Sequence, residues 1–198
     1  MFVFGHVGLT WGGALLLARL ARRPKPFAEP VATRRPSGAG IDFRLVILGS
    51  MLPDIIDKPL GVFVLSDEVS TGRAFAHSLA FVSAIALAAL LRPGTARRLL
   101  APVILGAAAH LVFDRMWMQP KTLLWPLLGW RLERVDVSDW VERMLEQLFS
   151  DPYTYVSEAA GAMLVVFLLA FLIRRGGLRD FILDGRMGPL GPCGRRAA

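Results

Sequence analysis

The chain is divided into long apolar runs separated by polar and basic connections, and this division constrains its fold more than any other feature. Of the 198 residues, 54% are hydrophobic and only 20% are charged, and the mean hydropathy is +0.49. Soluble domains of this length do not collect apolar residues in such blocks. The sequence therefore predicts an integral membrane protein, an all-α bundle of about five transmembrane helices. The five runs are residues 2–20, 43–52, 75–91, 99–113 and 159–173.

Each run is short against the ~20 residues that cross a typical bilayer, so we expect the helix ends to lie in the interface or under neighbouring protein. The first run is followed, not preceded, by basic residues, which favours a retained span over a signal peptide. We expect the second helix to be broken at Pro53. The short apolar patch 60–65 either completes that crossing or lies at the membrane surface.

Three further segments complete the predicted organisation. Residues 23–40 are rich in Pro and Arg and read as a flexible loop. Residues 116–156 form an extracytoplasmic segment with an amphipathic helix, which Asp136 or Ser138 would cap and which places Trp140 on its apolar side. That helix suits the membrane surface, a lid, or plain packing onto the bundle. Residues 1–175 are expected to form one membrane domain, and 176–198 an interfacial or disordered tail.

The positive charges set the expected topology. The net charge is +7, and clusters of Lys and Arg follow the first, third and fifth runs. By the positive-inside rule those ends are cytoplasmic, so we expect the amino terminus outside and the carboxyl terminus inside the cell, with the lipid bilayer as the main partner. No basic stripe is interleaved with exposed aromatics, which argues against direct nucleic-acid binding. The single cysteine, Cys193, excludes disulfides and Cys-based metal sites within one chain.

This topology, derived from Lys and Arg alone, gathers unusual polar residues at the outer face. His110 and Asp114 stand four residues apart, a spacing that puts an imidazole and a carboxylate on one helical face. All three histidines of the chain fall at this face together with three aspartates. The set comprises His6, Asp54, Asp57, His77, His110 and Asp114.

Such a set of side chains suits a divalent metal, because buried carboxylates normally require a cation or another partner. Three imidazoles and up to three carboxylates fit zinc, manganese or iron, and suffice for two ions. Two simpler readings remain open: His110 and Asp114 fasten two helices to each other, or the six residues are separate helix ends. Nearby cations, Arg73, Arg115, Lys58 and Lys121, could bind a phosphate, or could pair with carboxylates or lipid headgroups.

Several short motifs resemble the YdjM family. They are Gly5-His6, the block from Gly49 to Asp57, Ala76-His77-Ser78, Gly106 through His110 to Asp114, and Leu124-Trp125-Pro126. Their order and spacing carry the resemblance over residues 6–126. The family is described as LexA-binding, inner-membrane-associated, metal-dependent hydrolases, and its His-x-x-x-Asp element is similar to that of zinc-dependent phospholipase C.

The resemblance implies metal ligation by His6, Asp54, His77, His110 and Asp114, with Asp57 behind them or as an additional ligand. One feature departs from the family pattern. A His-Arg pair often precedes the His-Ser step, whereas Gly72-Arg73 stands here. The departure implies fewer metal ions, or weaker binding, than in a full member.

The leading hypothesis is a membrane-bound, metal-dependent hydrolase acting on a phosphoester, either a phospholipid or a lipid-linked phosphate. In it, Asp54 or Asp57 orients the attacking water, and Arg73 or Arg115 holds developing negative charge. Zinc is the expected ion, with manganese or iron as alternatives. Competing hypotheses are a metal transporter or sensor, and a scaffold that binds a soluble regulatory protein through residues 19–44. The apolar inner halves of the runs count against a transport path.

Overall fold

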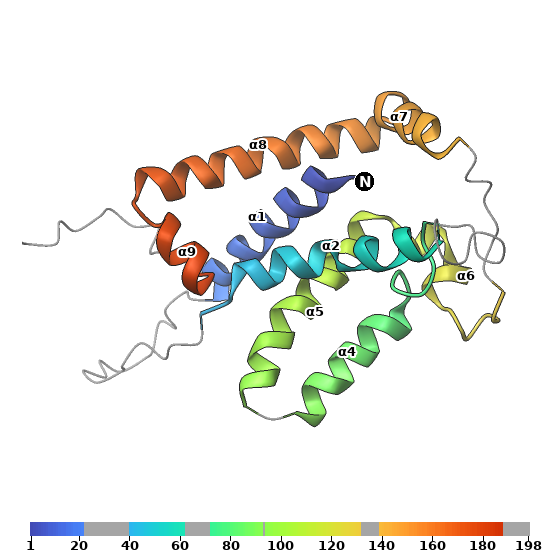
Figure 1. Cartoon of the computed structure of the whole chain (residues 1–198), viewed down its shortest axis with the longest axis horizontal. Coiled ribbons are helices and arrows are strands. Elements are labelled where there is room, and N and C mark those ends of the chain that lie inside the picture. Colours follow the sequence, from blue (N-terminus) through green and yellow to red (C-terminus); the bar gives the residue numbers. More distant parts are fainter. Residues whose placement is uncertain (22–39, 62–71, 93, 132–138, 188–198) are drawn as a thin grey trace, which may run out of the picture.

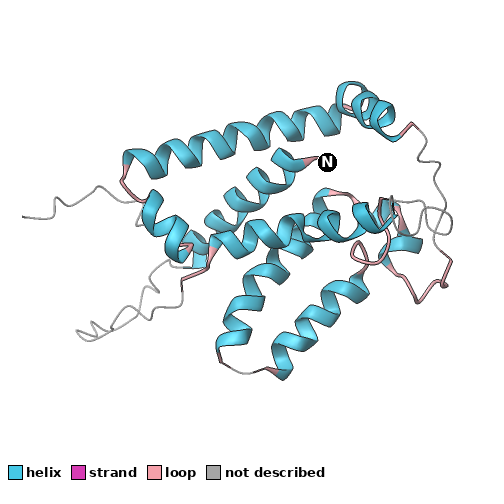
Figure 2. Cartoon of the chain, viewed as in Figure 1, coloured by secondary structure: helices cyan, strands magenta, loops and turns pink. Residues whose placement is uncertain are grey.

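The computed structural model describes residues 1–21, 40–61, 72–92, 94–131 and 139–187, and these are helical apart from short connections (Figures 1 and 2). The helices are α1 (Val3–Ala21), α2 (Phe43–Pro59), α4 (Leu79–Leu91), α5 (Thr95–Phe113), α6 (Pro120–Leu123), α7 (Trp140–Ser150), α8 (Pro152–Arg174) and α9 (Leu178–Asp184), with a 3-10 turn η2 (Met116–Met118). No strand occurs within these ranges. The predicted all-α class is confirmed.

Three helices are long and apolar enough to cross a membrane: α1, α5 and α8, with mean hydropathies of 1.3, 1.4 and 2.3. The 13-residue α4 is apolar but shorter, and the 17-residue α2 carries aspartates at its end. The multi-pass membrane bundle is therefore supported, while the number of five crossings stays a prediction. Successive long helices run in opposite directions, and α8 lies parallel to α1 (Figure 1).

Side-chain caps fix where several helices begin. The Asp42 carboxylate accepts a hydrogen bond from the Arg44 amide at the start of α2, and the Ser78 hydroxyl accepts one from Phe81 at the start of α4. Asp151 caps α8, accepting from the amides of Tyr153 and Thr154. The caps satisfy amides that a helix leaves without partners in its first turn.

The expected break at Pro53 is wrong, because α2 continues through this residue to Pro59. A proline inside a helix removes one hydrogen bond and costs about 3 kcal/mol. Here the packing of α2 against α5 offsets that cost, since Gly49 and Gly106 allow the two backbones to touch. As a result Asp54 and Asp57 lie on one helix, three residues apart and on the same side.

Other boundaries also differ from expectation. Helix α8 begins at Pro152, so the last residues of the predicted extracytoplasmic segment 116–156 belong to it. Helix α7 begins at Trp140 with Asp139 at its amino end, and the expected caps Asp136 and Ser138 lie outside the described residues. So do most of the loop 23–40, most of the patch 60–65, and Cys193.

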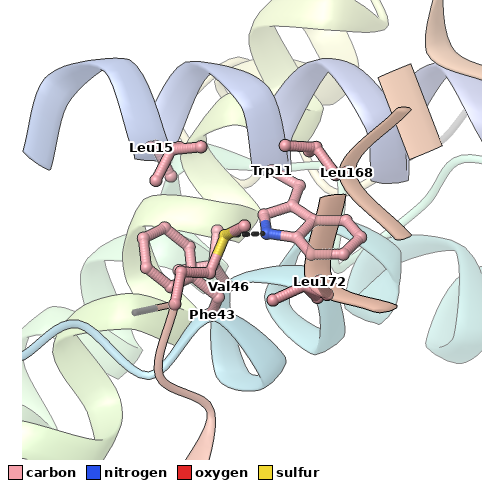
Figure 3. Packing of buried hydrophobic residues seen from close by; sticks show 8 residues of the cluster. Trp11, Leu15, Phe43, Val46, Leu168 and Leu172 are labelled. Carbon is pink, nitrogen blue, oxygen red and sulfur yellow. Dashed lines mark hydrogen bonds between the residues drawn. The ribbon is translucent and has the colours of Figure 1, made fainter. Parts of the chain in front are cut away.

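The apolar core lies at the end of the bundle where α2 begins and α8 ends (Figure 3). Trp11 of α1 donates its indole N–H to the Met187 sulfur at 3.2 Å and stacks on Phe181 of α9. Part of the predicted tail is therefore built into the fold. The buried cluster comprises Trp11, Ala14, Leu15, Phe43, Val46, Leu168, Leu172 and Met187.

Glycines bring the helices into backbone contact. Gly8 of α1 lies against Gly161 of α8, and Gly106 of α5 lies against the α2 backbone at Val46 and Gly49. Small residues at such crossings let helices pack closely where lipid provides no hydrophobic drive for association. The helix ends that carry His6, Asp54 and His110 are held together by these contacts.

We expect Gly106→Ala to lower the free energy of unfolding by about 1–3 kcal/mol, because a methyl group there meets the Val46 carbonyl and the backbone of Gly49. Thermal unfolding of the detergent-solubilised protein measures the change. The control is Gly13→Ala, where a methyl group meets nothing within 4 Å and alanine favours the helix by about 1 kcal/mol. Equal melting of the two variants would contradict the tight crossing.

Candidate metal centre

Five sequence-predicted residues from four parts of the fold converge at the end of the bundle opposite the apolar core. His6 lies on α1, Asp54 on α2, His77 in the turn before α4 and His110 on α5, while Asp114 caps the end of α5. All five are buried, with exposed fractions between 0% and 8%. The lateral convergence that topology alone left open is therefore present in the structure.

The facing atoms of four of these residues lie at the spacing of ligands around one small cation. The Nε2 atoms of His77 and His110 are 3.1 Å apart. Asp54 Oδ1 lies 3.5 Å from His77 Nε2 and 3.9 Å from His110 Nε2, and Asp114 Oδ2 lies 3.8 and 3.9 Å from the same two atoms. Tetrahedral zinc, with bonds of ~2.0–2.2 Å, separates its ligand atoms by about 3.3 Å.

Hydrogen bonds at the far side of each ring fix the tautomers of His77 and His110. His77 Nδ1 lies 2.7 Å from Asp57 Oδ2, and His110 Nδ1 lies 2.6 Å from the Ser50 carbonyl oxygen. Carboxylate and carbonyl oxygens only accept, so both Nδ1 atoms carry the proton. In neutral rings the two Nε2 lone pairs then face each other, and a proton or a metal ion must separate them.

His6 completes the cluster from α1. Its ring stacks on His110 with centroids 3.9 Å apart, and its Nε2 lies 3.1 Å from Asp114 Oδ1. His6 Nδ1 is buried and has no hydrogen-bond partner among the described residues. Two sets of three potential metal-binding residues result, and they share His110: His6, Asp54 and His110, and His77, His110 and Asp114.

Asp57 stands behind the cluster. It is fully buried, and its two oxygens accept from the backbone amides of Ala74, Ala76 and His77 as well as from the His77 ring. Three of these bonds go to Oδ2 and one to Oδ1, and residues 74–77 fold around the carboxylate. Asp57 therefore orients His77 and does not face the space between the Nε2 atoms.

The basic residues divide into two groups. Arg73 Nε lies 2.8 Å from Asp114 Oδ2, and Lys58 Nζ lies 2.7 Å from Asp54 Oδ2. The Arg115 guanidinium instead lies over the Tyr153 ring, 4.2 Å from its centroid, and is exposed. Lys121 is exposed on α6. Of the four predicted cations, Arg73 and Lys58 contact carboxylates of the cluster.

Two titratable groups of the cluster, Asp114 and His77, lie outside the helices, and nearby charges shift the pKa of each. Burial raises the pKa of the Asp114 carboxyl, but the His6 ring, Arg73 and the amino terminus hold that pKa well below its usual value. Burial lowers the pKa of His77, but the carboxylates of Asp54 and Asp57 outweigh it and raise the pKa above the ordinary histidine value. The polar cluster thus attracts positive charge, either a proton or a metal ion.

Glu158 is a residue of this region that the sequence reasoning missed. It lies buried on α8, and its carboxylate accepts from the amides of Phe2, Phe4 and Gly5, at 2.6–3.0 Å. The carboxylate thereby provides acceptors for the free amides in the first turn of α1, and its negative charge interacts favourably with the positive end of the helix dipole. His6 is the next residue, so α8 determines where that ring lies. An acidic residue inside an apolar helix was the available signal.

We expect Glu158→Ala to destabilise the protein by several kcal/mol, since three amides lose their acceptor at roughly 1–3 kcal/mol each. Glu158→Gln keeps one acceptor oxygen and should fall between this variant and the parent. Thermal unfolding in detergent measures both changes. Glu146→Gln on exposed α7 is the matched control and should melt like the parent. Parent-like melting of Glu158→Ala would show that α1 does not depend on this cap.

Comparison with known proteins gives one match. No curated protein and no solved structure shows significant similarity to the chain. The YdjM inner membrane protein family matches residues 1–178, which include every helix that contributes to the cluster and α8 behind it. The resemblance inferred from short motifs is therefore confirmed over most of the sequence. The chain belongs to the YdjM inner membrane protein family.

Proposed function

We propose that this protein is a membrane-bound, metal-dependent hydrolase that acts on a phosphoester. The observation that carries the proposal is the pair of facing Nε2 atoms 3.1 Å apart, with two carboxylates within 4 Å of them. A network built only to fasten helices would place donors against acceptors. Here, with both rings neutral, two acceptors face each other, which is the arrangement of ligands around a cation.

The donor set favours one ion. His110 Nδ1 is bound to Ser50, so His110 offers only Nε2, and the two sets of three residues that share this atom describe overlapping positions. Imidazole nitrogen and carboxylate oxygen, with no thiolate, suit zinc, and also manganese or iron. His77, His110, Asp54 and Asp114 would hold the ion, and His6 would bind it directly or orient Asp114.

A bound divalent ion would lower the pKa of a coordinated water and polarise a phosphoryl oxygen. The protein residues have separate parts in this scheme. Asp54 is the candidate to orient the water, because both oxygens of Asp57 are bonded to residues 74–77 and do not face the space between the Nε2 atoms. Arg73 is the candidate to hold charge on the phosphoryl group, because Arg115 is stacked on Tyr153. Burial of the cluster strengthens these electrostatic interactions.

The proposed substrate follows from where the cluster lies. Arg19, Arg92, Arg97 and Arg174 lie at the opposite ends of the helices, which by the positive-inside rule puts the cluster at the extracytoplasmic face. A site at the end of membrane helices lies at headgroup depth. We therefore favour a phospholipid or a lipid-linked phosphate as substrate, with the amino terminus outside the cell.

The decisive experiment combines metal content with turnover. We expect about one equivalent of zinc, manganese or iron in the parent by elemental analysis, and none in a His110→Ala, Asp114→Ala double variant, which lacks two of four ligands. Asp114→Asn should lose phosphoester hydrolysis. The control is Asp180→Asn on α9, at the other end of the bundle. Metal without turnover would favour a sensor, and no metal would overturn the proposal.

The residue behind the ligands provides a graded test. We expect Asp57→Asn to weaken metal binding by about 10–100-fold, because an amide in place of the carboxylate polarises the His77 ring less and holds it less firmly. Competition with a chelator of known affinity measures the change, again beside Asp180→Asn. An unchanged affinity, in a variant as stable as the parent, would mean that the metal does not bind His77.

A further inference from the structure

A wholly apolar pocket lies beside the polar cluster. Its volume is about 230 Å³, and no polar atom contributes to its surface. Its lining comes from helices α4 and α5, from η2 and from α6. The lining residues are Leu79, Val82, Ala108, Leu111, Val112, Met116, Trp117 and Leu123.

The pocket and the cluster are built from the same three stretches of chain. Leu79 follows His77 by two residues, Leu111 directly follows His110, and Met116 follows Asp114 by two. Two residues of chain extend at most ~7 Å, so in each of these three stretches a residue of the cluster lies close along the chain to a residue of the pocket. The side chains of His110 and Leu111 point to adjacent sectors of α5, the first toward α2 and the second toward α4.

We propose that this pocket holds one hydrocarbon chain of the substrate, next to the phosphoester at the metal centre. The inference rests on the proposed function and narrows it to a phosphoester carried on a lipid chain. A water-soluble phosphoester would gain nothing from an apolar pocket at this place.

The volume of the pocket fits a hydrocarbon chain better than a whole small molecule or a helix. Sites for whole small molecules usually enclose ~300–1,000 Å³, so 230 Å³ suits a segment of a ligand. A partner helix, ~10 Å across, does not fit. The lining residues Leu79, Val112 and Trp117 are 45–58% exposed, so the pocket opens to the surface that faces lipid. A chain can therefore enter sideways from the bilayer.

Apolar contact alone does not select a lipid. Lipid tails are as apolar as the pocket, so a chain that leaves the bilayer for it gains little from burial. Selectivity must come from the headgroup, whose phosphate reaches the metal centre and Arg73 only when its chain lies in the neighbouring pocket. The proposal thus predicts that headgroup and pocket act together.

Photocrosslinking tests this without turnover. The probe is a phosphatidic acid with a diazirine in one acyl chain, at low mole fraction in phosphatidylcholine nanodiscs that hold the metal-loaded protein. We expect the label on lining residues such as Leu111 and Met116. Ala108→Phe, which fills the pocket, should reduce this labelling by about tenfold, a modest loss for a blocked site. Ala88→Phe, on the exposed face of α4 outside the pocket, should leave it unchanged.

Two results would overturn the proposal: pocket labelling that survives Ala108→Phe, or equal labelling by a phosphatidylcholine carrying the same diazirine chain, which would mark any neighbouring lipid. Metal content, measured in parallel, should not change in Ala108→Phe. A hydrolysis assay distinguishes failure of the proposed hydrolase from failure of the proposed chain site. If the pocket is labelled selectively but neither a long-chain nor a soluble phosphoester is hydrolysed, the proposed hydrolase fails and the chain site stands.

Discussion

The polar end of this bundle depends on the opposed ring nitrogens of His77 and His110. In neutral rings these two nitrogens are acceptors 3.1 Å apart, which repel each other unless a proton or a metal ion lies between them, and bonds at Nδ1 keep both rings from turning away. The surrounding residues hold the two rings in this arrangement. Asp57 binds the backbone amides of residues 74–77 and so holds the His77 ring. The tight crossing of α2 and α5 brings the Ser50 carbonyl to the His110 ring.

The two ends of the bundle therefore have different physical roles. At the basic end, Trp11, Phe43 and Leu172 form an ordinary apolar core that also includes α9. At the other end, buried charges replace that core, and each carboxylate has a named partner: Lys58 for Asp54, Arg73 for Asp114, and the α1 amides for Glu158. Buried charges are tolerated only when partnered in this way. The apolar core thus stabilises the bundle, while the stability of the other end depends on the pairing of its buried charges.

Sequence reasoning predicted the fold class and gathered the site from simple signals. Apolar blocks indicated the helices, and Lys and Arg alone placed the three histidines and Asp54, Asp57 and Asp114 at one face, where the structure brings them together. It could not predict that α2 would continue through Pro53, because the local penalty of a proline is offset by contacts with α5 that no local pattern records. Sequence reasoning also could not separate the roles of Asp54 and Asp57, because these roles depend on which carboxylate accepts hydrogen bonds from the backbone amides of residues 74–77.

Glu158 shows most clearly why contacts between distant helices were not predicted. The last apolar run appeared to begin at Ala159, so the acidic residue before it read as the end of a polar connection. In the structure α8 starts about two turns earlier, at Pro152, and the carboxylate lies against the first turn of α1, more than 150 residues away. That contact couples the most apolar helix to the candidate metal centre. The family match over residues 1–178 reaches through α8, as expected if His6 is positioned only when both helices are present.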